Sequence, residues 1–522
     1  MTLGVPRKEG ELATDSATSQ RDRSSARVRG VARGSALNLS GATVMAVCLF
    51  ATTVAITRGM SRAQAGIFFS VTSLFLLATA VGQLGTNTAL VYFLSRARAL
   101  GRTNIIRAYV RTATVPVIVC ACAMTGAFLA FAPQLASLTN PHNVALATNY
   151  IRVLALFIPL AALESVALAA TRGLGTMRAN AAVEQFGRPI LQLLLVVGVV
   201  GISQLRALGL AWGLAYLPAA VAASLWLRSL TRRFRPPVDD PEVAVGVEFW
   251  RFSAPRALAS VAQVAMQRLD IILVGALSGA VQAAIYAAAT RFLVVGQMGN
   301  RAISMAVQPR LGQSLATNDH DAASHLYRVS TAWLISLTWP LYLSFLVFGS
   351  QLMHIFGRGY NAGSDVLLIL SSSMLLATGC GMVDIVLTMA GRTSWNLLNV
   401  LTALGVNVGL DLWLIPLYGI KGAAIGWAAA IIVQNLVPLT QIALAFKLHP
   451  FGRITAAAAL ISLISFGVVP LAFRTIFGTG WASLLAGLGS ACLCQLVGLW
   501  IFRDTLELSV LRAIRSGPRK EP

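Results

Sequence analysis

Long hydrophobic stretches follow one another along almost the whole chain, and polar residues are confined to short segments between them. Residues 454–471, for example, are interrupted only by Thr455, Ser462, Ser465 and small or proline residues. A run of about 18 or more mostly apolar residues is long enough to cross the hydrocarbon core of a bilayer as a helix. The runs do not alternate polar with apolar residues, as the strands of a membrane barrel would. The pattern therefore predicts an all-α, polytopic membrane protein without a large soluble domain.

At about 20 residues for each span, the chain holds about fourteen predicted transmembrane helices. Their approximate limits are 36–57, 64–94, 108–131, 146–171, 180–201, 207–227, 251–276, 283–308, 329–350, 363–389, 395–417, 420–446, 454–473 and 480–502.

Two pairs of similar segments indicate an internal repeat. Residues 65–69 (AGIFF) resemble 283–287 (AAIYA) at an offset of 218 residues, and residues 209–213 (GLAWG) resemble 424–428 (AIGWA) at an offset of 215. Halves with an even number of spans form a parallel repeat, related by an axis along the membrane normal. The prediction is two six-helix lobes followed by a helix pair: an N-lobe at 36–228, a linker at 229–249, a C-lobe at 250–447 and two further spans at 448–503.

The distribution of basic residues between the loops adds a predicted orientation in the membrane to this picture. The chain carries a formal charge of +22. If the N-terminus is cytoplasmic, the outer loops hold few basic residues: Arg58, Arg62, Arg206, Arg358, Lys421 and Arg474. This bias predicts a multi-pass protein of the plasma (inner) membrane with both termini cytoplasmic, including a disordered basic tail at 1–35 and a second tail at 504–522. Nucleic acid is not an expected partner, because no basic patch lies on a foldable soluble module.

Cofactor and metal motifs are not expected to contribute. All six cysteines lie inside apolar runs, and the two C-x-C pairs lack the C-x₂-C spacing of a zinc site. The sequence contains no P-loop, dinucleotide-binding fingerprint or HExxH helix. We therefore expect neither a cofactor nor a metal, and no ATP-driven chemistry within this chain.

Strongly polar residues nevertheless occur inside several predicted spans, where each costs several kcal/mol unless it faces a cavity or a partner. Gln263, Gln267 and Asp270 share one helical face in the span 251–276. Gln297 and Arg301 do the same in the next span, and Gln83 lies 218 positions before Arg301. Ser and Thr on such stripes are explained by packing between helices, whereas the amides and charges favour a hydrated cavity.

The charged members of these stripes suggest an anionic ligand. Arginine offers forked donors and a permanent charge, which suit a pyrophosphate. The candidate substrate-binding residues are Arg188, Arg268, Arg291, Arg301, Gln263, Gln267, Gln297 and Gln83. Asp270 and Asp411 are candidate sites for a coupling H⁺ or Na⁺, or they balance the arginines. Glu184 lies four residues before Arg188, so these two could instead neutralise each other.

Several segments in this order resemble the MOP flippase superfamily. They are Arg58–Phe69, Asp270–Gly275, Ile285–Phe292, Gln308–Leu311 and Tyr418–Ala424. Within that superfamily the chain looks most like the Wzx-type polysaccharide flippases, which have about fourteen spans and short loops. The lipid II flippases resemble one another in carrying arginines within the first span, and this chain has none between Ala36 and Thr57.

The resemblance implies a transporter that flips a polyprenyl-pyrophosphate-linked oligosaccharide by alternating access in cell-surface polysaccharide biosynthesis. Its expected partners are the lipid-linked saccharide, membrane lipids, H⁺ or Na⁺, and the polysaccharide biosynthesis machinery. One alternative is a drug or cation antiporter of the same superfamily. A membrane glycosyltransferase or polymerase is a further alternative, although no outer loop is large enough for the catalytic residues of such enzymes.

Overall fold

The computed structural model describes residues 40–141, 143–234 and 242–507. The tail predicted for 1–35, most of the tail predicted for 504–522, and positions 235–241 of the predicted linker lie outside these ranges. Within them every regular element is a helix. The all-α prediction is confirmed.

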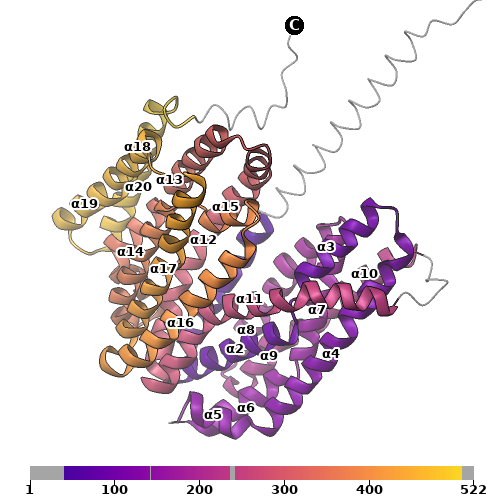
Figure 1. The fold of residues 1–522 in the computed structure, drawn as a ribbon. Helices are drawn as coiled ribbons and strands as arrows, with labels where there is room; N and C mark the ends of the chain where they lie inside the picture. Colours follow the sequence, from indigo (N-terminus) through magenta and orange to yellow (C-terminus); the bar gives the residue numbers. More distant parts are fainter. Residues whose placement is uncertain (1–39, 142, 235–241, 508–522) are drawn as a thin grey trace, which may run out of the picture.

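The N-terminal half forms one helical bundle (Figure 1). It begins with the helix Ser40–Gly59. Its other long or medium helices are α2 (Arg62–Gly82), α3 (Thr86–Ala99), α4 (Ile106–Ala130), α5 (Ala132–Thr139), α6 (Val144–Ala155), α7 (Ile158–Gly173), the π-helix η2 (Asn180–Gly187), α8 (Arg188–Gly201), α9 (Leu208–Leu214) and α10 (Tyr216–Thr231).

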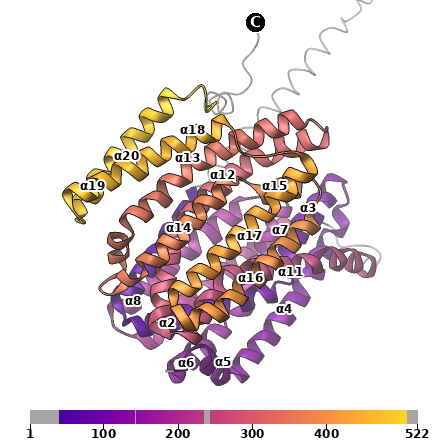
Figure 2. The same cartoon turned by 60° about the vertical axis from the view of Figure 1, so that its left-hand side comes forward.

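The C-terminal half forms the second bundle. It contains α11 (Glu242–Leu277), α12 (Ala280–Ala316), α13 (His320–Met353), α14 (Ser364–Gly379), α15 (Val383–Met389), α16 (Thr393–Tyr418) and α17 (Ile420–Phe446). A final group comprises α18 (Arg453–Ser462), the π-helix η6 (Leu463–Val468), α19 (Val469–Phe477) and α20 (Trp481–Ile501), which pack on α13 at the edge of this bundle (Figure 2). Short 3₁₀ turns are η1 (Thr103–Ile105), η3 (Leu205–Ala207), η4 (His354–Phe356) and η5 (Tyr360–Gly363).

The number of membrane spans is close to the prediction. Among the described residues, twelve helices are long and apolar enough to cross a membrane, and α6 with α7 form a thirteenth span if the 40° bend between them is counted within it. The remaining predicted span corresponds to α12, which is 37 residues long but less apolar because Gln297, Arg301 and Gln308 lie along it. The chain is therefore a multi-pass membrane protein.

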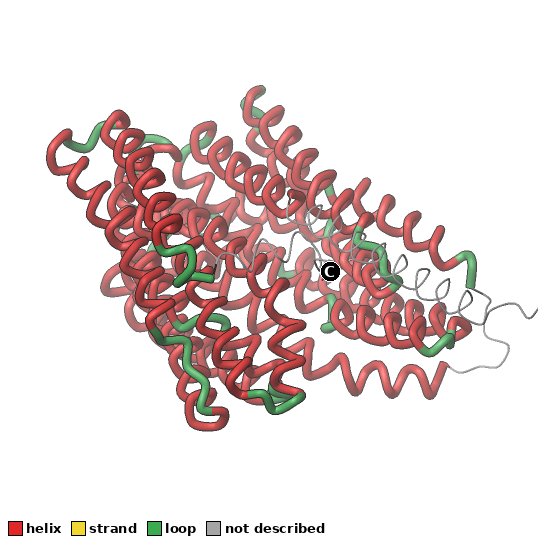
Figure 3. The backbone as a smooth tube through the Cα atoms, turned by 90° about the horizontal axis from the view of Figure 1, so that it is seen from above, coloured by secondary structure: helices red, strands yellow, loops and turns green. Residues whose placement is uncertain are grey.

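The two bundles meet at one end of the molecule and diverge toward the end where the first helix begins and α20 ends (Figure 1). At the meeting point α2 crosses α12 so closely that a Cβ on Gly66 would lie 1.7 Å from the Ala280 carbonyl oxygen. Beside this contact, the Ser70 hydroxyl donates a hydrogen bond of 3.4 Å to the Ile271 carbonyl in α11. We call this the closed end of the molecule. Seen from above, the helices of both bundles are joined by short loops (Figure 3).

Helix α11 is shared between the bundles. Its first half packs on the N-terminal bundle, where the Phe252 ring stacks on Tyr92 with ring centroids 4.6 Å apart. The Ser253 hydroxyl donates a hydrogen bond of 2.8 Å to the Leu84 carbonyl, at the break between α2 and α3. Gly85 has a φ of +69° at this break and lies against the α11 backbone. Side chains from the middle of α11 consequently reach the junction between the two bundles.

Candidate functional site

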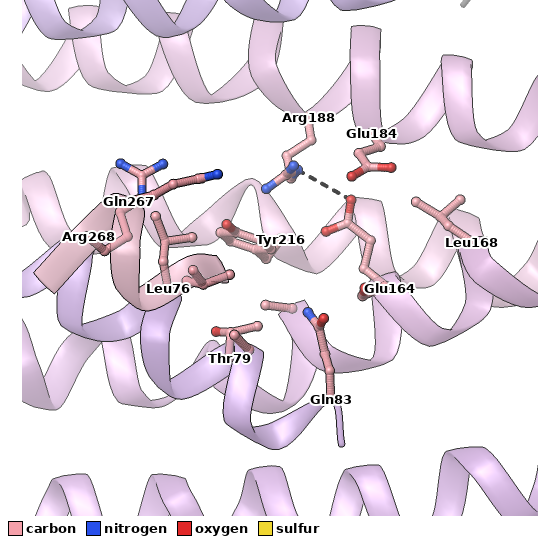
Figure 4. Close-up of a pocket in the computed structure, with 14 residues that line it drawn as sticks. Leu76, Thr79, Gln83, Glu164, Leu168, Glu184, Arg188, Tyr216, Gln267 and Arg268 are labelled. Atoms are coloured by element: carbon pink, nitrogen blue, oxygen red, sulfur yellow. Dashed lines mark ion pairs between the residues drawn. The ribbon is translucent and has the colours of Figure 1, made fainter. Parts of the chain in front are cut away.

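A cavity of about 230 Å³ lies where α11 crosses the N-terminal bundle (Figure 4). We call it the N-lobe cavity. Its walls come from α2, α7, the η2–α8 segment, α10 and α11. Four of the predicted substrate-binding residues line it: Gln83, Arg188, Gln267 and Arg268. Residues that are far apart in sequence are thus brought to one polar space within the membrane-spanning part of the chain.

Arg188 is held in this cavity by two partners. Its Nε atom lies 3.3 Å from Oε1 of Glu164, and the two side chains are 19% and 4% exposed. The guanidinium also lies 4.8 Å from the centre of the Tyr216 ring. A cation in a low-dielectric environment needs such partners, because burial without them is costly.

The structure pairs Arg188 differently from the i, i+4 interpretation. Glu184 lies 3.6 Å from Arg172, and Arg188 pairs with Glu164 instead. Residues Asn180–Gly187 form a π-helix, whose wider turn removes the usual alignment of positions four apart. Glu164 and Tyr216 were not among the predicted residues, although a lone carboxylate within the apolar run 146–171 is a signal that could have found Glu164.

Arg268 differs from Arg188 in its surroundings. It lines the same cavity, but within the described residues it forms no ion pair with a carboxylate. Figure 4 shows its guanidinium and the Gln267 amide on one side of the cavity, with Glu164 on the other. Arg268 therefore provides a cation that is available to a negatively charged ligand.

A second cavity of about 470 Å³, the C-lobe cavity, continues the polar surface into the other bundle. It contains the predicted residues Gln263, Gln267, Gln297 and Arg301. Gln267 lines both cavities. Further polar side chains on its walls are Asn300, Ser304, Gln308, Asp384, Asn396, Gln434 and Asn435. Amides donate and accept hydrogen bonds at the same time, which is the chemistry needed to bind hydroxyl groups.

Arg291 lines neither cavity. It is 8% exposed, it lies 6.0 Å from the centre of the Phe69 ring in α2, and its Nε atom has no hydrogen-bond partner within the described residues. Its charge and that of Arg268 repel each other. The structure thus places Arg291 outside both cavities, between α12 and α2.

Asp270 and Asp411 form a separate buried cluster in the C-terminal bundle. The Tyr286 hydroxyl donates a hydrogen bond of 2.7 Å to Asp270, and the Asn407 amide donates one of 3.3 Å to Asp411. The two carboxyl groups lie close enough to interact with each other. Within the described residues, one side-chain oxygen of each of Asp270, Asn407 and Asp411 has no hydrogen-bond partner. The cluster lines neither cavity, so it is a candidate for an ion and not for the main substrate.

Two family models match the sequence. One, described as "Polysaccharide biosynthesis protein", matches residues 31–315, and one described as MatE matches residues 255–413. No curated protein sequence matches the chain.

Solved structures share the fold. One titled "Lipid II flippase MurJ, inward closed conformation" has a TM-score of 0.71 at 13% identity, covering 90% of this chain and 99% of that one. An inward-facing multidrug resistance MATE family transporter of the MOP superfamily has a TM-score of 0.63 at 16% identity, covering 79% of this chain and 98% of that one. A MOP superfamily transporter from Pyrococcus furiosus has a TM-score of 0.57 at 16% identity, covering 80% and 96%. Identities this low indicate a common fold and do not identify a substrate.

Proposed function

The chain belongs to the polysaccharide biosynthesis protein family, and from that premise we propose that it flips a polyprenyl-pyrophosphate-linked oligosaccharide across the plasma membrane. The observation that supports this proposal most directly is Arg268, a cation without a carboxylate partner within the described residues, on the wall of a cavity inside the membrane-spanning bundle. A pyrophosphate supplies the charge that such a site lacks.

The two cavities suggest that the pyrophosphate and the sugar of the substrate bind in different places. The pyrophosphate would lie against Arg268 and Arg188 in the N-lobe cavity, where it would compete with Glu164 for the Arg188 guanidinium. The sugar hydroxyls would lie against amides of the C-lobe cavity, with Gln267 at the boundary. The polyprenyl chain would stay in the lipid, because apolar surface is best left there.

Transport by alternating access requires the two lobes to rock about this site. The tight crossing of α2 and α12 closes one end of the molecule, and the bundles diverge at the other end (Figure 1). Release on the far side would need the α2–α12 contact to part. With both termini cytoplasmic, as the distribution of basic residues predicts, the closed end would face outward.

The Asp270–Asp411 cluster is our proposed coupling site. Two neighbouring buried carboxyl groups repel each other when both are ionised, so one of them favours holding a proton, and the pair can bind and release H⁺. The unpartnered oxygens of Asp270, Asn407 and Asp411 are also hard ligands of the kind that Na⁺ prefers. Because Asp270 belongs to α11, the helix shared by both bundles, binding there can influence the position of the lobes.

A drug or cation antiporter is the second candidate, and the MatE match over residues 255–413 favours it. Glu164, 4% exposed at the wall of the N-lobe cavity, is the residue that could hold a cationic drug. An enzyme such as a glycosyltransferase or polymerase is not our proposal.

Transport by the purified protein distinguishes these functions. We would reconstitute the full chain in proteoliposomes that contain a polyprenyl-pyrophosphate-linked oligosaccharide and measure how much saccharide becomes accessible to an added lectin. If the protein flips this lipid, the saccharide should become accessible to the lectin faster than in liposomes that contain the lipid-linked saccharide but no protein. Equal rates, together with uptake of a cationic dye, would favour the antiporter, and elongation of the saccharide would favour an enzyme.

The cellular test concerns the leaflet in which the precursor lies. Deletion of the gene should leave the lipid-linked precursor on the cytoplasmic side and reduce the surface polysaccharide. An unchanged distribution between leaflets would count against the proposal. Co-purification with glycosyltransferases or a polymerase would support the predicted association with the biosynthesis machinery.

A further inference from the structure

A hollow of about 710 Å³ lies at the closed end, outside the two cavities already described. Its walls combine the segment between the first helix and α2 with the loop between α13 and α14. The nine residues on them are Thr57, Arg58, Met60, Ser61, Arg62, His354, Gly357, Arg358 and Tyr360. We call it the closed-end hollow. One wall comes from each half of the chain.

Basic side chains are concentrated in this hollow. Of the six Arg and Lys residues that the sequence analysis places in loops at this end, three line it: Arg58, Arg62 and Arg358. Lys421 and Arg474 have other partners, since Lys421 lies 2.7 Å from Asp365 and Arg474 donates to the Val347 carbonyl. Like charges gathered in one place repel one another unless an anion lies between them.

The described part of the chain places no carboxylate between these arginines. None of the nine lining residues is Asp or Glu. Within the described residues, Arg58, Arg62 and Arg358 form no ion pair with a carboxylate. Their charges are therefore not neutralised by the part of the protein that the structure describes.

Two of these arginines instead bind backbone carbonyls of the opposite lobe. Arg58 Nε donates a hydrogen bond of 2.8 Å to the Ile355 carbonyl, and an Arg62 Nη atom donates one of 3.2 Å to the Gly359 carbonyl. A guanidinium has five N–H donors, so these single bonds leave most of them available. Both bonds run between the lobes, and the arginines thus already lie where a ligand would contact both halves.

A further donor is provided by Tyr360. This residue lines the hollow, it is 1% exposed, and its hydroxyl has no hydrogen-bond partner within the described residues. A buried hydroxyl without a partner is uncommon and suggests a ligand or a water molecule. The hydroxyl can donate to a phosphate oxygen.

From these observations we propose that the closed-end hollow binds a phosphate-class anion, held jointly by arginines of both lobes. Arg58 and Arg62 contact it from the N-terminal half, and Arg358, His354 and Tyr360 from the C-terminal half. Arginine forks match phosphate oxygens in pairs, and an anion held from both sides offsets their mutual repulsion. The bound anion stabilises the closed end. This inference does not depend on the identity of the transported substrate.

The test is a titration of the full chain with inorganic pyrophosphate, in nanodiscs of phosphatidylcholine. We expect saturable binding that weakens with salt, since the site is open to solvent. The double variant Arg58→Gln/Arg358→Gln should bind at least about tenfold more weakly, because two charge-assisted contacts are lost. Arg206→Gln removes the same charge at the same end but outside the hollow, and should bind like the parent.

Three results would overturn the inference. They are absence of binding by the parent, equal binding by the double variant, and equal loss in Arg206→Gln. Arg268→Gln separates this site from the proposed transport site: a loss of pyrophosphate binding in Arg268→Gln with retention in the double variant would place the anion in the N-lobe cavity and refute the proposal. Both substituted residues of the double variant are exposed, and an unchanged unfolding temperature would confirm that it is folded.

The source of the anion is determined with a second set of nanodiscs that contain phosphatidic acid, a lipid with a phosphomonoester head group. If this lipid competes with pyrophosphate in the parent, the hollow takes a lipid head group. If it does not compete, the hollow takes a free anion from solution. Either result supports a phosphate-class site, provided that the double variant binds pyrophosphate more weakly than the parent.

Discussion

Arg188 and Arg268 line the same cavity, and they differ in how the charge of each is balanced. Arg188 is paired with Glu164 and covered by Tyr216, so its charge contributes to holding α8 against α7 and α10. Arg268 forms no ion pair within the described residues, so its charge is available to a substrate. The two arginines should therefore respond differently to substitution.

We expect Arg268→Gln to lower the initial rate of saccharide exposure in proteoliposomes at least about tenfold, because a charge-assisted contact to the pyrophosphate is lost. Protein abundance and unfolding temperature should not change. Arg251→Gln, on the same helix but exposed near its start, is the control and should transport normally. Normal transport by Arg268→Gln would remove this residue from the site.

The Arg188–Glu164 pair predicts a different outcome. Removing one member of a buried ion pair leaves the other charge uncompensated, which costs about 3–5 kcal/mol. Glu164→Gln and Arg188→Gln should each lower the unfolding temperature, and the double variant should recover much of the loss. A double-mutant cycle measured by thermal unfolding checks this expectation, and additive losses would contradict it.

Seven of the eight predicted substrate-binding residues line one of the two cavities, because a charge or an amide inside an apolar run stands out in a sequence. The direction of each side chain could not be predicted in this way. Arg291 was predicted as a substrate ligand, yet it lies six positions before Gln297 and thus about 120° away around α12, where it meets Phe69 and not a cavity. The partner of Arg188 depended on the π-helix before it, which no spacing rule indicated.

At the level of elements, the crossing of α2 and α12 is a tight contact between the lobes. Gly66→Leu should open it, because the new side chain would overlap the Ala280 carbonyl. Overpacking of this kind costs about 1–3 kcal/mol, which shifts a two-state equilibrium by about tenfold. Spin labels at Leu138 and Tyr418, both exposed and in different bundles, should report longer distances in a background without the six native cysteines.

Gly126→Leu is the control for this substitution. Gly126 lies within α4, and nothing lies within 4 Å of the position that its Cβ would take. Its distance distribution should match that of the parent. A similar distribution in Gly66→Leu would mean that the α2–α12 contact does not hold the closed end together.

The hydrophobic runs predicted the helices well, and the interruptions within them much less well. The expected span 64–94 is two helices, with Leu84 and Gly85 at positive φ between them. Hydropathy is insensitive to such a break, since the residues around it remain apolar. The sharing of α11 by both bundles also depends on tertiary contacts of Phe252 and Ser253 that have no signature in its own sequence.

At the scale of the whole molecule, the distribution of basic residues predicts the orientation in the membrane. An alkaline phosphatase fused after Ser203, in the loop between α8 and α9, should be active because the enzyme folds only outside the cytoplasm. A fusion after residue 522 should be inactive. The reverse pattern would invert the predicted topology and place the closed end inside.

Ion coupling is also a property of the whole molecule, because an ion bound at Asp270 and Asp411 must bias the position of both lobes. Asp411→Asn should make saccharide exposure independent of an imposed H⁺ or Na⁺ gradient. Asp365→Asn, which removes an exposed carboxylate that pairs with Lys421, should retain the dependence shown by the parent. Gradient-driven transport by Asp411→Asn would exclude the cluster as the coupling site.

The helices from α18 to α20 dock on α13 and extend the C-terminal bundle alone. They make that bundle the heavier and broader of the two bodies, so the surrounding lipid resists its motion more. In a relative rotation, the N-terminal bundle should sweep through the larger angle. A fluorophore placed after Ile501 would then serve as a nearly stationary reference, and a second dye on α4 would report the rotation of the N-terminal bundle relative to it.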